Sequence, residues 1–320
     1  MKNFFQKELY MKKAVSVMVL LLAVYGYLYS QVGEQVHIVG GNGYDAVYWL
    51  NGQRNVLPKT DGSAVASAIA VSGSNVYIAG GNGGDAVYWL NGRRNVLPKT
   101  GYYARASAIA VSGSNIYIAG MDGDDAVYWL NGKRNVLPRT RNRAFTTAIA
   151  VSGSNVYITG RDGDGEVADA VEEAVYWLNG QINVLPKTTS QAFAGAIAVS
   201  GSNVYIAGSD GDDAVYWLNG QRNVLPKTGY YASARAIAVS GSNVYIAGGD
   251  SGDAVYWLNG QRNVLPKTSA AGASAIAVSG SNIYITGNDG NDAVYWLNGQ
   301  RNVFPRTGDF ENTYAIAVSR

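Results

Sequence analysis

The sequence predicts an all-β fold: a seven-bladed β-propeller with four antiparallel strands per blade, in which the C-terminal strand completes the N-terminal blade and closes the ring. The first observation is a repeat, because all seven Trp residues stand in the context VYWLNG at spacings of 39 to 48 residues. The second is that each repeat holds four short runs rich in Val, Ile, Tyr and Trp, separated by turn residues. The third is that the two ends of the repeat region hold complementary parts of one repeat.

The four runs of a repeat are clear in residues 68–100, where they read AIAVSG, NVYIAGG, DAVYWLNG and RNVLPKT. The Asn-Gly pair after the third run is a strong hairpin signal, because a type I′ turn needs positive φ at both central positions. The small AIAV run suits the crowded centre of a ring, and the bulky VYWL run suits the wider space further out. Pro cannot donate to a strand ladder, so we expect the LPKT run at the outer edge.

The ends of the repeat region predict how the ring closes. Residues 36–41, VHIVGG, match the second run of the other repeats and leave the first run of that blade missing. Residues 315–319, AIAVS, are a spare first run. A stacked solenoid would show atypical capping repeats instead. We therefore expect the last strand to complete the first blade.

Over nearly all of residues 36–319, the repeat resembles that of the kelch family of propellers. The resemblance rests on an apolar strand that ends in Gly-Gly, at 40–41, 80–81 and 248–249, and on Tyr and Trp in the next strand. Other repeats have a different residue after the first Gly, and Tyr and Trp are adjacent here whereas kelch repeats separate them. The resemblance implies the fold and the strand order, and no kelch-type partner.

Residues 1–30 have the layout of a secretory signal peptide. The stretch MKNFFQKELYMKK is basic, the next 17 residues are uncharged and mostly apolar, and Met11 is a second candidate start after Met1. We predict cleavage near residue 30, with an uncleaved anchor as the alternative. Residues 31–320 then form a single seven-bladed propeller domain in an extracytoplasmic location: secreted, periplasmic or at the cell surface.

Composition excludes several classes of function. The net charge is +2, and residues 1–30 carry four Lys against one Glu, so the predicted domain has a net charge of −1. A near-neutral domain with evenly spread basic residues is a poor nucleic-acid binder. The absence of Cys excludes disulfides and thiolate metal sites. We expect a monomer without a nucleic-acid partner and without membrane insertion after cleavage.

The repeats differ mainly in the lead-in to the third strand and in the connection from LPKT to the next AIAV. In an antiparallel blade these two loops emerge on the same face. The connections carry aromatic and Arg side chains, the composition of a recognition surface. The predicted ligand-binding residues are Tyr102, Tyr103, Arg105, Arg143, Phe145, Phe193, Tyr230, Tyr231, Arg235, Phe310 and Tyr314. Packing between blades is the alternative for Phe145, Phe193 and the second Tyr of each pair.

One lead-in, residues 161–173 with the sequence RDGDGEVADAVEE, is about eight residues longer than the others. The repeat resumes in register after it, so we interpret it as a loop on the variable face, where Glu166, Asp169, Glu172 and Glu173 would form an acidic lobe. The spacing of Asp162, Asp164 and Glu166 is also that of a calcium loop, but Asp-Gly is ordinary turn chemistry and no EF-hand ligand series follows. We favour the turn and predict no metal and no cofactor.

Each repeat has an acidic residue before AVYW, and most have an Arg after the Asn-Gly turn. Counting back through the turn pairs Arg54 with Trp49, so we expect the guanidinium to stack on the indole. The same count brings Asp45 near Lys59. The fourth repeat has Glu173 and Ile182 at these positions, so we expect Trp177 to pack on Ile182.

The sequence contains few of the residue patterns that an enzyme would need. The one His, His37, is assigned a structural role, and the chain has no nucleophile elbow or phosphate loop. A hydrolase or lyase of an extracellular polysaccharide could use Asp309 or Glu311, and a purely structural repeat protein is a third class. We predict a secreted binding or adhesion module that recognises an extracellular glycan or protein through the variable-loop face.

Overall fold

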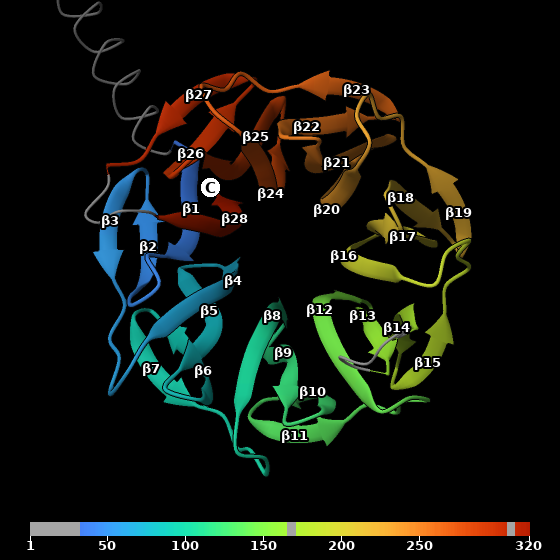
Figure 1. Cartoon of the computed structure of the whole chain (residues 1–320). Helices are drawn as coiled ribbons and strands as arrows, with labels where there is room; N and C mark the ends of the chain where they lie inside the picture. The colour runs from blue at the N-terminus through green and yellow to red at the C-terminus, as the bar shows by residue number, and fades with distance from the viewer. Residues whose placement is uncertain (1–32, 165–170, 306–310) are drawn as a thin grey trace, which may run out of the picture. The chain divides into compact units, whose positions relative to one another are not determined.

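The computed structural model describes residues 33–164, 171–305 and 311–320. Residues Val36–Val318 form one compact unit, a ring of seven four-stranded antiparallel sheets (Figure 1). The predicted seven-bladed propeller is confirmed. A second unit is described only at residues 33–35 and 319–320, where Arg320 Nη2 lies 2.9 Å from Glu34 Oε1. The predicted signal segment 1–30 lies outside the described residues, and none of the described stretches contains a helix long and apolar enough to cross a membrane.

Every blade has four strands, which follow one another from the centre of the ring to its rim. The innermost strands are β4 (Ala64–Ser72), β8 (Ala104–Ser112), β12 (Arg143–Ser152), β16 (Ala192–Ser200), β20 (Ala232–Ser240), β24 (Ala271–Ser279) and β28 (Asn312–Ser319). The second strands are β1 (Gln35–Gly41), β5 (Asn75–Asn82), β9 (Asn115–Asp122), β13 (Asn155–Gly163), β17 (Asn203–Asp210), β21 (Asn243–Asp250) and β25 (Asn282–Asp289). The third strands are β2 (Ala46–Leu50), β6 (Asp85–Leu90), β10 (Asp125–Leu130), β14 (Glu172–Leu178), β18 (Asp213–Leu218), β22 (Asp253–Leu258) and β26 (Asp292–Leu297). The outermost strands are β3 (Gln53–Val56), β7 (Arg93–Val96), β11 (Lys133–Val136), β15 (Gln181–Val184), β19 (Gln221–Val224), β23 (Gln261–Val264) and β27 (Gln300–Val303).

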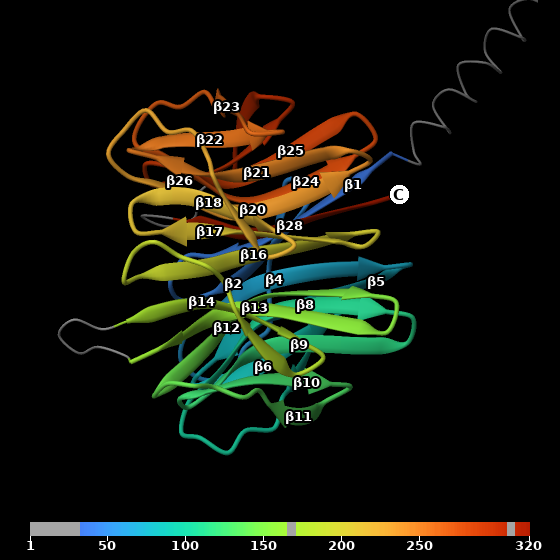
Figure 2. The same cartoon turned by 90° about the vertical axis from the view of Figure 1, so that its right-hand side faces the viewer.

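Strand order and turns follow the sequence prediction. The first blade has the order β28-β1-β2-β3, so the last strand of the chain completes it. The Asn-Gly turns have φ of 50° at Asn51 and 83° at Gly52, positive at both positions as a type I′ turn requires. Figure 2 shows the blades edge-on, with the loops gathered at the two ends of the strands.

The bulky core lies between blades, and all seven Trp side chains are fully buried there. The first Gly of each Gly-Gly or Gly-X pair permits this packing. A Cβ on Gly80 would collide with the carbonyl oxygen of Val65 on the innermost strand, and the equivalent Gly of every other blade meets the same obstacle. The second position is less restricted: a Cβ on Gly81 or Gly249 would make only ordinary contacts, although one on Gly41 would meet the carbonyl oxygen of Asp45. This difference explains why the first Gly is invariant along the chain and the second is not.

Two repeated hydrogen bonds join neighbouring blades. The indole Nε1 of Trp129 donates to the carbonyl oxygen of Pro98 in the preceding blade, at 2.8 Å. The carboxylate of Asp122, at the end of β9, accepts bonds from the backbone N–H groups of Thr100 and Gly101 in the connection between the same two blades. These contacts fix the connections from which the predicted recognition residues project.

Candidate functional site on the loop face

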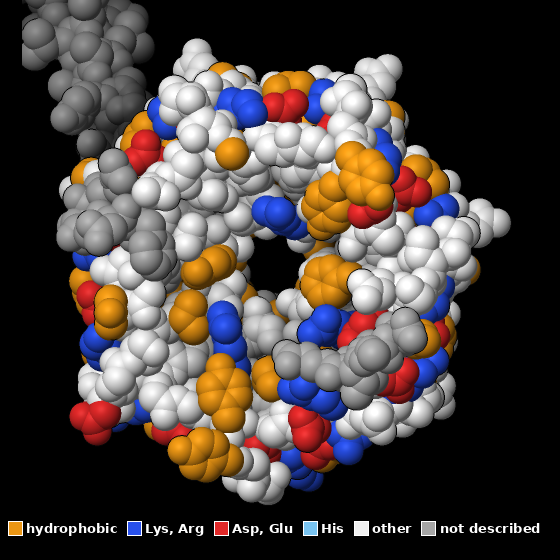
Figure 3. Space-filling model, viewed as in Figure 1, with side chains coloured by type: hydrophobic (Ala, Val, Ile, Leu, Met, Phe, Trp, Pro, Cys, Tyr) orange, Lys and Arg blue, Asp and Glu red, His pale blue; other side chains and the backbone are white. Residues whose placement is uncertain are grey.

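The loops after the second and fourth strands lie on one face, as predicted, and they contact each other. The N–H of Gly83, in a lead-in, donates to the carbonyl oxygen of Ser63, and the N–H of Ala104 donates to that of Gly84. The space-filling view of this face shows a central opening bordered by hydrophobic and basic side chains (Figure 3). The variable loops therefore lie on a face where the central channel opens (Figure 3).

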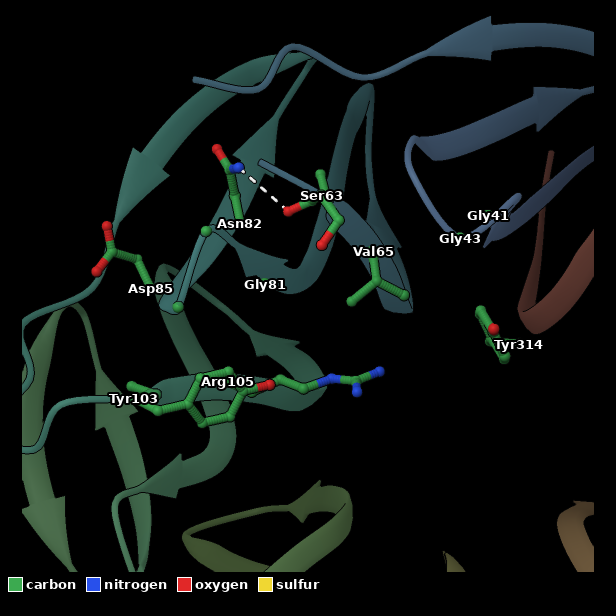
Figure 4. Close-up of a pocket in the computed structure, with 14 residues that line it drawn as sticks. Gly41, Gly43, Ser63, Val65, Gly81, Asn82, Asp85, Tyr103, Arg105 and Tyr314 are labelled. Carbon is green, nitrogen blue, oxygen red and sulfur yellow. Dashed lines mark hydrogen bonds between the residues drawn. The ribbon is translucent and has the colours of Figure 1, made fainter. Parts of the chain in front are cut away.

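The first cavity at this mouth has a volume of about 280 Å³ and lies over the second blade. Its walls bring together three predicted residues from the two neighbouring blades: Tyr103 and Arg105 from the third blade and Tyr314 from the first. Gly41, Gly43, Gly81, Gly83 and Gly84 form much of the rest, so backbone rather than side chain faces the cavity there. In Figure 4 the Arg105 side chain extends toward the space between Val65 and Tyr314. Glycine walls allow a ligand to approach the backbone closely.

A second cavity, of about 330 Å³, lies within the channel. Ser67, Ser107 and Thr147 line it, and each is the extra residue of a β-bulge in its innermost strand. Tyr314 has the same position in the repeat and lines the same cavity. A bulge re-aims the side chain that it carries, and here it turns Ser67, Ser107 and Thr147 toward the channel. Arg235 is the bulge residue of β20 and is exposed.

A third cavity, of about 320 Å³, lies over the fifth blade and is related to the first by the repeat. Phe193 and Tyr231 line it, with exposed fractions of 38% and 43%. Gln191 and Asp212 contribute polar groups. Phe193 and Tyr231 stand at the positions that Val65 and Tyr103 occupy in the first cavity.

Arg143 and Phe145 form a separate cluster with a third residue that the sequence does not single out, Arg161. The guanidinium carbons of Arg143 and Arg161 lie 4.9 and 5.0 Å from the Phe145 ring centroid. Phe145 and Arg161 are cross-strand partners on β12 and β13, and Arg143 Nε lies 2.9 Å from Asp124 Oδ1. The Phe145 ring is therefore covered by two cations of its own blade.

The Tyr pairs divide into an exposed and a half-exposed member. Tyr102 is 99% exposed and Tyr230 is 82% exposed, whereas Tyr103 and Tyr231 are each 43% exposed. Tyr44, in the lead-in of the first blade, is 75% exposed on the same face and was missed in the sequence analysis. The sequence does indicate that this position varies, because Gly84 and Asp124 stand at the equivalent position in the next two repeats. Phe310 lies outside the described residues.

The repeated Arg residues do not stack on Trp, and this prediction is wrong. The register is as expected, with Arg134 opposite Trp129. However, Arg134 Nε donates to Asp122 Oδ2 at 2.6 Å, because a guanidinium long enough to reach a buried carboxylate gains more there than on an indole. The predicted contact of Trp177 with Ile182 in the fourth blade is confirmed, as is the ion pair of Asp45 with Lys59, at 2.8 Å.

Several predicted carboxylates have structural roles. Asp162 is fully buried and accepts bonds from the backbone and hydroxyl of Thr140, so it acts as a loop cap. Glu173 pairs with Lys187 and Arg141, so the described end of the long loop is neutralised rather than an acidic lobe. Glu311 is buried with Arg54, 2.8 Å away, and is inaccessible to a substrate. Glu166, Asp169 and Asp309 lie outside the described residues.

His37 is buried, and its Nδ1 lies 2.7 Å from the Tyr48 hydroxyl. Burial lowers the pKa of this imidazole. Within the described stretches, no group of three or more His, Asp or Glu side chains is placed to hold a metal ion.

No known family model matches the chain, and no curated protein matches its sequence. The chain is similar to the crystal structure of the computationally designed Ika8 protein, with a TM-score of 0.52 and 18% identity over 87% of this chain and 86% of that one. It is also similar to the crystal structure of a nidogen/laminin complex, with a TM-score of 0.51 and 11% identity over 88% of this chain and 98% of that one. At these identities the similarity shows the fold alone, and the kelch resemblance stays a prediction. The chain is a seven-bladed β-propeller with four antiparallel strands in each blade.

Proposed function

We propose that this protein is an extracytoplasmic binding module that recognises an extracellular glycan or protein through its loop face. The observation that carries the proposal is the exposure of Tyr102 and Tyr230, at 99% and 82%. Aromatic rings left in water by the fold are available to bury on a partner, and Tyr supplies contact area with little loss of side-chain entropy.

The differences between repeats support the same face. Trp, the Asn-Gly turn and the Pro of each blade do not vary, because they hold the ring together. The side chains around the channel mouth do vary: Ser67, Thr147, Arg235 and Tyr314 stand at one position of the repeat. A purely structural ring could use the same residue type at this position in every blade, whereas a single asymmetric ligand needs different side chains around it.

A binding screen of the purified protein against glycan and extracellular-protein arrays, with and without calcium, tests this proposal. The double variants Y102A/Y103A and Y230A/Y231A are expected to lose binding and to keep the melting temperature within about 2 °C of the parent, because surface truncations cost little stability. The control is Arg93→Gln on the outermost strand β7, which places there the residue that β19 and β23 have.

Three outcomes are decisive. Binding that survives both double variants would exclude the tyrosine pairs from the site. Unfolding of the double variants would show that the Tyr residues pack between blades. Release of shortened products from a bound glycan would assign the protein to the hydrolase or lyase class instead.

A further inference from the structure

Two Arg side chains at the channel mouth, Arg105 and Arg235, have no carboxylate partner among the described residues. Arg105 donates to the Ser67 hydroxyl at 3.2 Å, and Arg235 donates to the Ser233 hydroxyl at 3.2 Å. Elsewhere on this face the basic side chains are mostly paired with acids, as Lys99 is with Asp85 and Arg134 is with Asp122. A guanidinium without a carboxylate partner has further N–H donors with which to bind an anion, and Arg105 also lines the first and second cavities.

The sequence of the innermost strands extends this observation to the whole channel. The seven strands β4, β8, β12, β16, β20, β24 and β28 contain no Asp or Glu. Asp85 is the carboxylate at the wall of the first cavity, and Figure 4 shows it pointing away from Arg105. A narrow opening that carries one sign of charge focuses its field and concentrates ions of the opposite sign. The channel mouth is therefore attractive to anions.

The remaining lining indicates which anion fits. Beside Arg105 lie the half-exposed rings of Tyr103 and Tyr314, the hydroxyls of Ser67 and Thr147, and the glycine wall of the first cavity. Aromatic rings, hydroxyls and open backbone suit the flat, hydroxyl-rich surface of a sugar, while the planar guanidinium matches a carboxylate in two-point contact. Arg235 lies against Gly249 and Gly272, three blades further round the ring, and supplies a second cationic point.

We propose that the channel mouth binds the carboxylates of an acidic polysaccharide, a polymer of uronic acid residues, with Arg105 and Arg235 as its cationic contacts. This proposal rests on the proposed glycan-binding function and makes its ligand specific. A polymer long enough to contact both Arg residues would gain avidity over the single sugar.

The test measures binding of a soluble polyuronate, its monomer, and the same polymer after reduction of its carboxyl groups to alcohols. The parent protein is expected to bind the polyuronate, with an affinity that falls as salt is raised. Arg105→Gln and Arg235→Gln should each weaken binding by about tenfold or more, the change that loss of a charged hydrogen bond produces. Arg105→Lys should restore part of the affinity, and the control Arg93→Gln should leave it unchanged.

The result that overturns the proposal is equal binding of the intact and the reduced polymer, or no effect of either Arg variant. If the intact and the reduced polymer bind equally and Y102A/Y103A binds neither, the loop-face function stands and only the specificity for acidic polymers fails. Binding of poly-glutamate that depends on Arg105, without binding of polyuronate, would assign the site to an acidic protein partner. No binding in any arm, with the arrays also negative, refutes the proposed function itself.

Discussion

The guanidinium Nε of Arg134 lies 2.6 Å from Oδ2 of Asp122, a carboxylate buried at the end of the second strand of the same blade. The fourth blade has the carboxylate, Asp162, without the cation, because Ile182 stands in place of the Arg. We predict that Arg134→Ile lowers the free energy of unfolding by about 2 kcal/mol, since it removes a hydrogen bond to a charged group. Ile182→Arg should raise it by about 1 kcal/mol. Urea denaturation of both variants checks the pair, and a destabilised Ile182→Arg would contradict it.

The buried Asp caps also predict acid sensitivity. Burial alone would raise the pKa of Asp122, but the hydrogen bonds from Thr100 and Gly101 and the charge of Arg134 outweigh it and hold the pKa below its ordinary value. The pKa values of Asp210, Asp250 and Asp289 are lowered in the same way. A depressed pKa contributes stability above the unfolded-state value of about 3.9, and that stability is lost as pH falls through the folded-state value. The melting temperature should therefore be level between about pH 7 and pH 5 and fall below about pH 4. A melting temperature that rises on acidification to pH 4 would show that these carboxylates are not stabilised in the fold.

A comparison of Trp49 with Trp129 measures how much the hydrogen bond between blades contributes to the free energy of unfolding. Trp49 is fully buried like Trp129, but its Nε1 has no hydrogen-bond partner among the described residues, and its ring packs 5.2 Å from that of Phe304. Trp129→Phe loses both volume and the bond to Pro98, whereas Trp49→Phe loses volume alone. We expect Trp129→Phe to cost about 1 kcal/mol more than Trp49→Phe. Differential scanning calorimetry of the two variants decides, and equal costs would mean that the bond contributes nothing net.

The two Gly residues of a pair should respond oppositely to substitution. Gly80→Ala should destabilise the fold by roughly 1–3 kcal/mol or more, because its Cβ meets the Val65 carbonyl. Gly81→Met copies Met121 of the next blade, so it should fold normally while it fills the first cavity and weakens ligand binding. Thermal melts and the binding assays above measure both effects. Unchanged binding by Gly81→Met would place the ligand outside this cavity.

The fold was predictable because the same local signals recur seven times and only one topology satisfies both ends of the repeat region. The site was less predictable, because a strand pattern shows neither which way a side chain at a bulge turns nor how far a long side chain extends. The bulge at Ser67, and at Arg235 in the equivalent position, breaks the simple alternation of side chains from which strand faces are predicted. Cross-strand counting placed Arg134 beside Trp129 correctly, yet it could not show that the guanidinium continues to Asp122.

The order β28-β1-β2-β3 has a consequence for biosynthesis. The inner edge of β1 remains an open strand edge until the end of the chain has been made, since its neighbour β28 begins at Asn312. Six blades can assemble from contiguous sequence, but the ring becomes topologically complete only in the last step. Until then, the β28 strand of another copy of the chain could dock on the open edge of β1, which makes the ring prone to exchange of this strand between copies.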